Sequence, residues 1–147
     1  MDTSPVDILL IEDNLNDVEL ALRALKKSGI ANNIIVVNDG EDALDFIYCR
    51  NKYDHRKPND KPKVILLDLK LPKVDGLKVL KIIKNDDEKK MIPVIVLTSS
   101  DQEKDMIESY KFGVNSYIQK PVDFDQFVEA VKQIGMYWLL LNKLPNL

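Results

Sequence analysis

The sequence predicts an α/β fold, in which a doubly wound parallel sheet of five strands is covered by five helices. Two observations lead to this prediction. Short apolar runs rich in β-branched residues are continuous rather than alternating, which is typical of strands buried on both faces of a parallel sheet. Segments with helical spacing separate these runs, so strand and helix alternate five times along the chain.

Five apolar runs are the candidate strands. Four of them are short and continuous, at residues 8–11, 34–37, 64–67 and 94–97. The fifth, from Val114 to Ile118, is weaker. Runs of this length fit strands better than helices, which are usually longer.

The first two helices have recognisable boundaries. Apolar residues recur at i, i+3, i+4 and i+7 between residues 18 and 25, which gives one helical face. Asn14 precedes this face as a candidate N-cap, and Gly29 follows it where a C-terminal cap prefers glycine. We expect the second helix to start at Asp39 and Gly40.

The remaining helices are bounded by similar signals. The third helix should follow Gly76. For the fourth, Ser100 and Glu103 have the spacing of a capping box, and Gly113 marks the end. Asp123 is the candidate cap of the fifth helix, which again has apolar residues at i, i+3, i+4 and i+7.

Length and composition favour one domain over residues 1–147, with a core at about 6–134 and an apolar C-terminal helix extension at about 135–147. The net charge of −3 lacks the basic excess of a nucleic-acid binder. No apolar run approaches the roughly 20 residues that span a bilayer, so we expect no membrane segment. The single cysteine, Cys49, cannot form an internal disulfide, and we expect a cytoplasmic protein.

One polar loop, from Asn51 to Pro62, is longer than most connections in α/β folds. We expect a solvated surface segment there rather than a dedicated binding loop. His55 in this loop has no second histidine or cysteine partner, so a surface residue is expected rather than a metal ligand.

Chemically active residues follow four of the five candidate strands. The first strand ends in Glu12 and Asp13, the third in Asp68, the fourth in Thr98 and the fifth in Lys120. In open α/β sheets, ligands bind beyond the carboxyl ends of the strands. Three carboxylates, a hydroxyl and an ammonium group should therefore converge at one edge of the sheet.

Such a group can support phosphoryl transfer. Clustered carboxylates repel one another unless a cation holds them, and an oxygen-only ligand set of this size suits Mg²⁺. Asp68 could then act as a nucleophile and form an acyl phosphate. The metal, the lysine and the hydroxyl would stabilise the negative charge of the phosphoryl oxygens.

Four segments resemble the motifs of the receiver domains of two-component response regulators, and the resemblance runs from about residue 6 to about residue 134. It implies a flavodoxin-like sheet with strand order 2-1-3-4-5. Any single motif would be weak, but all four occur in order, each at a strand end. The segments are Leu10 to Asn14, Leu66 to Gly76, Val96 to Ser99, and Tyr117 to Pro121.

The resemblance implies a role for each site residue. Asp68 would accept the phosphoryl group from a phosphohistidine of a histidine kinase, and Mg²⁺ would be the cofactor. Its ligands would be Asp13, Asp68, the backbone carbonyl of Lys70 and, through water, Glu12.

Two further roles follow from the same resemblance. Thr98 would bond to the bound phosphoryl group after moving toward it, and Lys120 would pair with a phosphoryl or carboxylate oxygen. Tyr117 would be an aromatic switch residue, so that phosphorylation changes the face made of the fourth helix, fifth strand and fifth helix. An aromatic residue on a strand is more often simply packed in the core, and this alternative stays open for Tyr117.

Two positions depart from the common receiver pattern. Lys70 puts a cation two residues after the acceptor, where many receivers carry an apolar or amide side chain. Ser100 lies two residues after Thr98. Because these positions flank the path of the attacking water in the family, the lifetime of the phosphorylated form stays open.

The C-terminal residues carry more apolar surface than packing on the sheet requires. Tyr137, Trp138, Leu140 and Leu141 are expected to form a homodimer interface, since exposed apolar patches usually mark interfaces. The alternative is that this segment folds back over its own domain. The short chain with an aromatic pair after its last helix resembles the response regulators of phytochrome-type histidine kinases, which would then be the partner.

A rival function from another class is a Mg²⁺-dependent phosphatase or phosphotransferase that uses Asp68 as a turnover nucleophile. Such enzymes often carry a second aspartate two residues later as general acid, and Lys70 occupies that position here. A signalling protein is therefore favoured over an enzyme.

Overall fold

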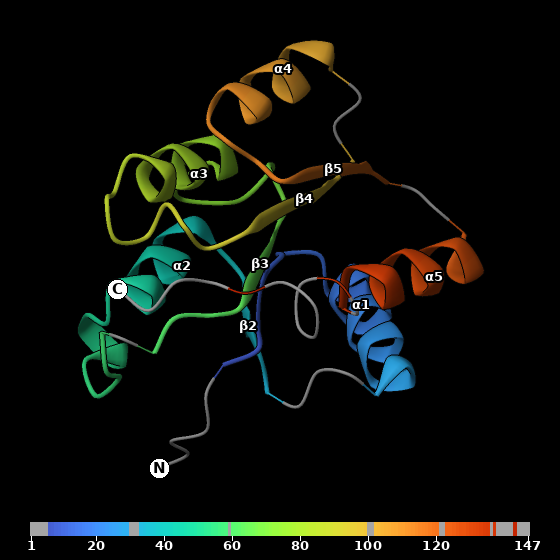
Figure 1. Cartoon of the computed structure of the whole chain (residues 1–147), viewed down its shortest axis with the longest axis horizontal. Coiled ribbons are helices and arrows are strands. Elements are labelled where there is room, and N and C mark those ends of the chain that lie inside the picture. Colours follow the sequence, from blue (N-terminus) through green and yellow to red (C-terminus); the bar gives the residue numbers. More distant parts are fainter. Residues whose placement is uncertain are drawn as a thin grey trace.

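Five parallel strands form the sheet in the computed structural model, in the order β2-β1-β3-β4-β5, which confirms the expected doubly wound topology (Figure 1). Every neighbouring pair is parallel. The structure describes residues 6–29, 33–58, 60–99, 102–120, 123–135, 137 and 143. The strands are β1 (Ile8–Ile11), β2 (Ile34–Val37), β3 (Val64–Leu67), β4 (Val94–Thr98) and β5 (Ser116–Gln119).

Helices follow the strands and cover both faces of the sheet. In Figure 1, α1 and α5 lie side by side on one face, while α2 and α3 lie on the other. A short 3₁₀ helix, η1, begins the long loop after α2. The helices are α1 (Leu15–Ser28), α2 (Gly40–Ile47), η1 (Asn51–Tyr53), α3 (Gly76–Lys84), α4 (Glu103–Lys111) and α5 (Phe124–Gly135).

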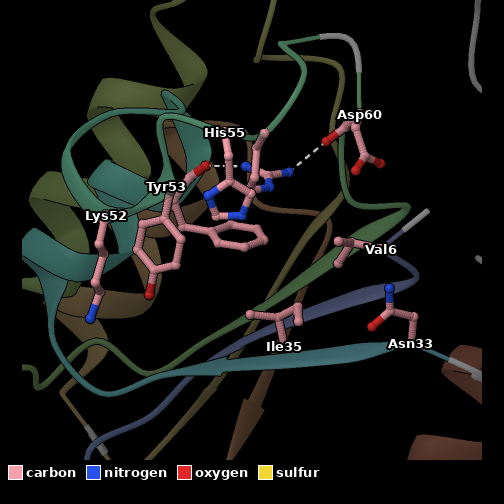
Figure 2. Close-up of a pocket in the computed structure, with 9 residues that line it drawn as sticks. Val6, Asn33, Ile35, Lys52, Tyr53, His55 and Asp60 are labelled. Atoms are coloured by element: carbon pink, nitrogen blue, oxygen red, sulfur yellow. Dashed lines mark hydrogen bonds between the residues drawn. The ribbon is translucent and has the colours of Figure 1, made fainter. Parts of the chain in front are cut away.

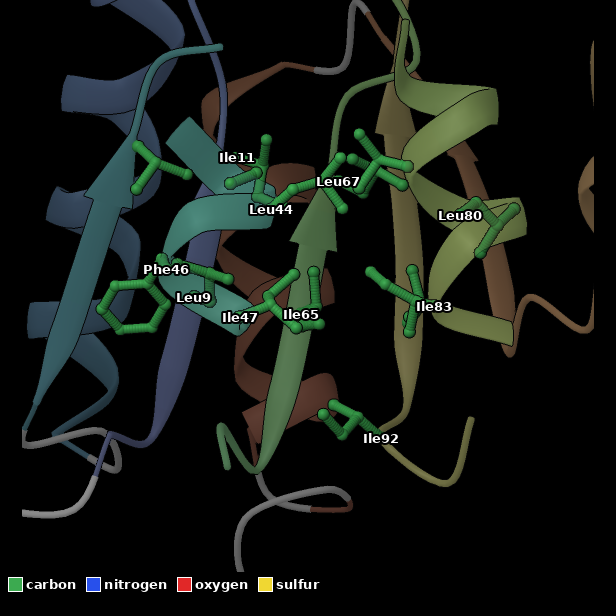
Figure 3. Packing of buried hydrophobic residues seen from close by; sticks show 14 of the residues in the cluster. Leu9, Ile11, Leu44, Phe46, Ile47, Ile65, Leu67, Leu80, Ile83 and Ile92 are labelled. Atoms are coloured by element: carbon green, nitrogen blue, oxygen red, sulfur yellow. The ribbon is translucent and has the colours of Figure 1, made fainter. Parts of the chain in front are cut away.

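The apolar runs of β1, β3 and β4 are buried on both faces, as expected for a parallel sheet, whereas the edge strand β2 is partly exposed. Along β1, Leu9 and Ile11 join one core cluster, which includes residues of α2 and α3 (Figure 3). Ile8 and Leu10 point to the other cluster, which includes Ala21 and other residues of α1. Each strand therefore contributes to two cores, which is why its sequence does not alternate with polar residues.

The two predicted N-caps, Asn14 and Asp123, are present, and Asp39 caps α2 at the predicted start of that helix. The Asn14 side chain accepts hydrogen bonds from two backbone N–H groups in the first turn of α1, and Asp39 does the same for one in α2. Asp123 accepts from the Gln126 N–H at 2.9 Å. Gly29 ends α1 in the left-handed conformation, with φ of 68°.

Two predicted boundaries were wrong. The fourth helix begins at Glu103 with Gln102 as its N-cap residue, so Glu103 is the first helical residue and not the third position of a capping box. Ser100, the other half of that box, lies outside the described residues. β5 begins at Ser116 rather than Val114. Val114 is buried before the strand starts.

Several C-terminal expectations fall outside the described part of the chain. This holds for Trp138, Leu140 and Leu141, and for the apolar side chains of α5 that form its i, i+3, i+4 and i+7 pattern. Tyr137 is described and is 51% exposed. Among the described residues, no helix combines the length and the apolar character needed to cross a bilayer.

Candidate functional site

Asp68 lies directly after β3 and is held by two hydrogen bonds. The Thr98 hydroxyl donates to Asp68 Oδ1 at 2.9 Å, and the backbone N–H of Lys70 donates to the same oxygen at 3.1 Å. Asp68 is 6% exposed and Thr98 is fully buried. The carboxylate is therefore fixed in direction before any ligand arrives.

A close backbone approach shapes the loop that carries Asp68. A Cβ atom on Gly76 would lie 2.3 Å from the Asp68 carbonyl oxygen and 2.5 Å from Leu69 Cα. The Gly76 N–H also donates to the Leu69 carbonyl at 2.9 Å. Only glycine leaves room for the start of α3 to lie against this loop.

Three carboxylates meet at the carboxyl end of β1 and β3. One oxygen from each of Glu12, Asp13 and Asp68 lies within 4.8 Å of the others. Glu12 and Asp68 are buried, whereas Asp13 is exposed. Oxygen ligands at this spacing, with one side open to water, fit a hard divalent cation such as Mg²⁺, which retains some of its waters.

Burial and a like charge act together on Glu12. Its desolvation, reinforced by the neighbouring Asp68, raises the pKa of Glu12 to about 7, with Lys120 opposing this shift. A carboxyl group with such a pKa holds a proton in part of the molecules at neutral pH. A bound cation would favour the ionised form instead.

Lys120 follows β5 and reaches into the same cluster. Its Nζ lies 2.6 Å from Glu12 Oε1 and 3.6 Å from Asp68 Oδ2. Burial alone would lower the pKa of Lys120, but its contacts with Asp17, Glu12 and Asp68 outweigh this and raise it. The ammonium therefore stays charged beside the acceptor.

The structure thus brings together Glu12, Asp13, Asp68, Thr98 and Lys120, as the sequence predicted. Lys70 has an exposed side chain, and its backbone N–H rather than its side chain contacts Asp68. Tyr117 on β5 is half-buried and packs against the cluster of Leu9 and Ile11.

One residue of the site was missed in the sequence. Asp17, in the first turn of α1, forms a 2.6 Å ion pair between its Oδ2 and Lys120 Nζ. A signal for it existed, because Asp17 lies three residues after the cap Asn14 and the helix N-terminus faces the same edge of the sheet.

The long loop forms a second feature, away from this site. The Arg56 guanidinium stacks on the Phe46 ring at 3.6 Å and donates to the backbone carbonyls of Phe46 and Asp60. It borders a cavity of about 400 Å³ that Tyr53 and His55 also line (Figure 2). Arg56 thus ties the loop to the domain, while most of the described loop residues, His55 among them, are exposed as expected for a surface segment.

The chain is similar to known proteins along nearly its whole length. It matches the response regulator receiver domain family over residues 8–132. The probable methanogenesis regulatory protein FilR2 of Methanothrix harundinacea is 39% identical over 142 residues, which cover 97% of this chain and 89% of that protein. Response regulator Rcp1 of Synechocystis sp. is 40% identical over 141 residues, which cover 96% of this chain and 94% of that protein.

Two solved structures have a similar fold. The Mn²⁺-bound form of Rcp1 has a TM-score of 0.85 at 40% identity and covers 96% of this chain and 99% of its own. The phosphorylated cyanobacterial phytochrome response regulator RcpA has a TM-score of 0.86 at 39% identity, with 97% and 99% covered. One relative thus binds a divalent metal and another is phosphorylated.

Proposed function

The chain belongs to the response-regulator receiver family, and from this premise we propose that Asp68 accepts a phosphoryl group from the phosphohistidine of a histidine kinase. The observation that supports this assignment is the convergence on Asp68 of a hydroxyl, an ammonium and two further carboxylates from the ends of three other strands. The hydroxyl and the ammonium can stabilise the negative charge on the oxygens of a phosphoryl group in transfer, and the carboxylates can hold a cation that does the same.

The phosphoryl transfer from the phosphohistidine to Asp68 is a balanced step in which one bond forms as another breaks. An Asp68 carboxylate oxygen forms a bond to phosphorus while the phosphorus–nitrogen bond of the phosphohistidine breaks, and the histidine nitrogen keeps the electron pair. Lys120 and Thr98 then donate to the phosphoryl oxygens. Mg²⁺, held by Glu12, Asp13, Asp68 and the Lys70 carbonyl, would neutralise further charge, and Mn²⁺ in Rcp1 supports a divalent ion here.

The proposal includes a conformational response. A phosphoryl group can shift the balance of two states only by binding one of them better, which here would occur through Thr98 and Lys120. Thr98 ends β4 and pairs in register with Gln119 of β5, two residues after Tyr117. We expect Tyr117 to change its burial when Thr98 follows the phosphoryl group, which would alter the α4-β5-α5 face.

The same proposal covers the kinase partner, the assembly of the protein and its role as a phosphoacceptor. The kinase would be of the phytochrome type, as the name of the relative RcpA suggests, and the protein would act in the cytoplasm as a homodimer. We propose a phosphoacceptor and not a turnover enzyme, because the position two residues after Asp68 carries the exposed Lys70 and no general acid. The whole chain would form one receiver domain.

The deciding experiment is the phosphorylation of the Asp68→Asn variant. Incubated with acetyl phosphate and Mg²⁺, the wild type should gain one acid-stable, base-labile phosphoryl group, whereas the variant should gain none because an amide cannot form the acyl phosphate. Intact-protein mass spectrometry measures this. The matched control is Asp87→Asn, since Asp87 is an exposed aspartate far from the site, with 96% of its side chain accessible. Undiminished incorporation in Asp68→Asn, or normal incorporation with chelator present, would contradict the proposal.

A further inference from the structure

Lys120 contacts three carboxylates, but unequally. Its Nζ is 2.6 Å from Glu12 Oε1 and 2.6 Å from Asp17 Oδ2. The Nζ lies 3.6 Å from Asp68 Oδ2, which is too long for a direct hydrogen bond. The ammonium is therefore bonded beside the phosphoacceptor and not to it.

Of the two close partners, Asp17 is the one that can release Lys120 at small cost. The Glu12 side chain is 4% exposed, so losing its partner would leave a buried charge uncompensated. The Asp17 side chain is 34% exposed, and water can replace the ammonium there.

The position of Asp17 on its helix supports such a release. Asp17 lies in the first turn of α1, and its N–H bonds to the cap Asn14 at 3.1 Å. The positive end of the helix dipole favours a carboxylate in the first turn. Asp17 therefore has a second source of stabilisation once Lys120 has left it.

We propose that Asp17 is a positioning residue, which holds Lys120 before phosphorylation and releases it to the phosphoryl oxygens afterwards. The inference rests on the proposed phosphorylation of Asp68. It has two consequences. First, phosphorylation is slowed because the Lys120–Asp17 ion pair has to break. Second, the negative charge of Asp17 offsets the positive charge of Lys120 near the acidic cluster, which favours binding of a cation.

The test is the Asp17→Asn variant, which keeps the shape of the side chain and removes its charge. At saturating Mg²⁺, the rate constant for phosphorylation by acetyl phosphate should rise about fivefold, the equivalent of about 1 kcal/mol for a partly exposed ion pair. The affinity for Mg²⁺, measured by titration calorimetry, should fall by a similar factor, because Lys120 then acts on the cluster without compensation.

Opposite changes in the two quantities separate this role from a structural one. A mere loss of helix stability would leave the rate constant unchanged or lower it. The matched control is Glu19→Gln on the same helix, since the exposed Glu19 pairs with the exposed Arg23 and its replacement changes the net charge equally. This control should keep the wild-type rate constant and the wild-type Mg²⁺ affinity.

A double-mutant cycle with Lys120→Met tests whether the effect of Asp17→Asn on the rate constant depends on Lys120. In that background, Asp17→Asn should no longer raise the rate constant. A wild type that takes no phosphoryl group would refute the proposed function itself. If the wild type is phosphorylated, three results would overturn this inference alone. These are an Asp17→Asn rate constant equal to or below that of the wild type, an unchanged Mg²⁺ affinity of Asp17→Asn, and a rate constant that Asp17→Asn still raises in the Lys120→Met background.

Discussion

Single residues in this site are governed by the balance between burial and charge pairing. Glu12 and Asp68 are buried side by side, and one ammonium serves both of them together with Asp17. Buried like charges are costly unless a cation or a proton relieves them. In the absence of a metal, the relief falls to Lys120 and to protonation of Glu12.

Glu12 should therefore make stability depend on pH in a metal-free buffer. Its pKa is raised from 4.5 to about 7, so the folded chain keeps a proton that the unfolded chain loses between these values. The free energy of unfolding should fall as pH rises from about 4.5 to 7, by about 1–3 kcal/mol. Denaturant titrations with chelator at pH 5 and pH 7.5 measure this.

The Glu12→Gln variant provides the control, because an amide does not titrate. This step in stability should disappear in Glu12→Gln and remain in Glu19→Gln, whose side chain is exposed. A wild-type pH dependence that survives in Glu12→Gln would show that another group causes it.

Thr98 should couple the site to β5. The Thr98→Ala variant loses the hydroxyl that donates to Asp68, so it should still be phosphorylated but should respond only weakly around Tyr117. Amide hydrogen exchange across residues 98–120, with and without acetyl phosphate, measures the response. Ser99→Ala is the neighbouring exposed control. A full wild-type response in Thr98→Ala would rule out this coupling.

Elements meet at the site through tight backbone contacts as well as through side chains. The start of α3 lies against the loop after β3 because Gly76 has no side chain. A similar contact fixes the start of α2, where a Cβ atom on Gly40 would lie 1.9 Å from the Val74 carbonyl oxygen. These two glycines hold the loop from Leu69 to Asp75 between two helices.

Gly76→Ala should therefore disturb both the fold and the site. The added Cβ would lie 2.3 Å from a backbone oxygen of Asp68, so the loop must move, and we expect a loss of more than about 2 kcal/mol in unfolding free energy. Gly29→Ala is the control, because a Cβ there meets nothing within 4 Å and costs only about 1 kcal/mol for its positive φ. Thermal unfolding of both variants tests this; equal losses would contradict the steric argument.

At the scale of the whole molecule, the apolar C-terminal residues should decide assembly. Tyr137 is half exposed beyond the end of α5, and Trp138, Leu140 and Leu141 follow it in the sequence. Apolar surface is disfavoured in water by roughly 25 cal/mol per Å², and a two-fold contact between copies would bury it.

We therefore predict a homodimer that depends on this segment. Deleting residues 137–147, or changing Trp138→Ala, should shift the protein to a monomer, while Tyr110→Ala on the exposed face of α4 tests whether that helix contributes to the interface. Sedimentation velocity at tens of micromolar measures the state. A wild-type monomer, or a dimer that survives the deletion, would count against the prediction.

The sequence by itself determined the fold and most of the site. The pattern of apolar residues is a local property of the chain. It predicted the strands, which are buried on two faces and read as continuous apolar runs, and the helices, which are buried on one face and repeat every three to four residues. The caps Asn14 and Gly29 were equally local. Asp68 and Thr98 could be assigned because the topology of a parallel sheet brings all strand ends to one edge.

Only the tertiary structure decided the contacts between segments that are distant in sequence. The Lys120–Asp17 pair joins residues 103 positions apart, so the place of Asp17 in the first turn of α1 indicates which edge of the sheet it lies near but not that it binds Lys120. Likewise, Arg56 folds the long loop onto Phe46 through a ring face and backbone carbonyls, which leave no mark in the sequence. The start of α4 also differs from its local capping signal, since Gln102 is the N-cap residue.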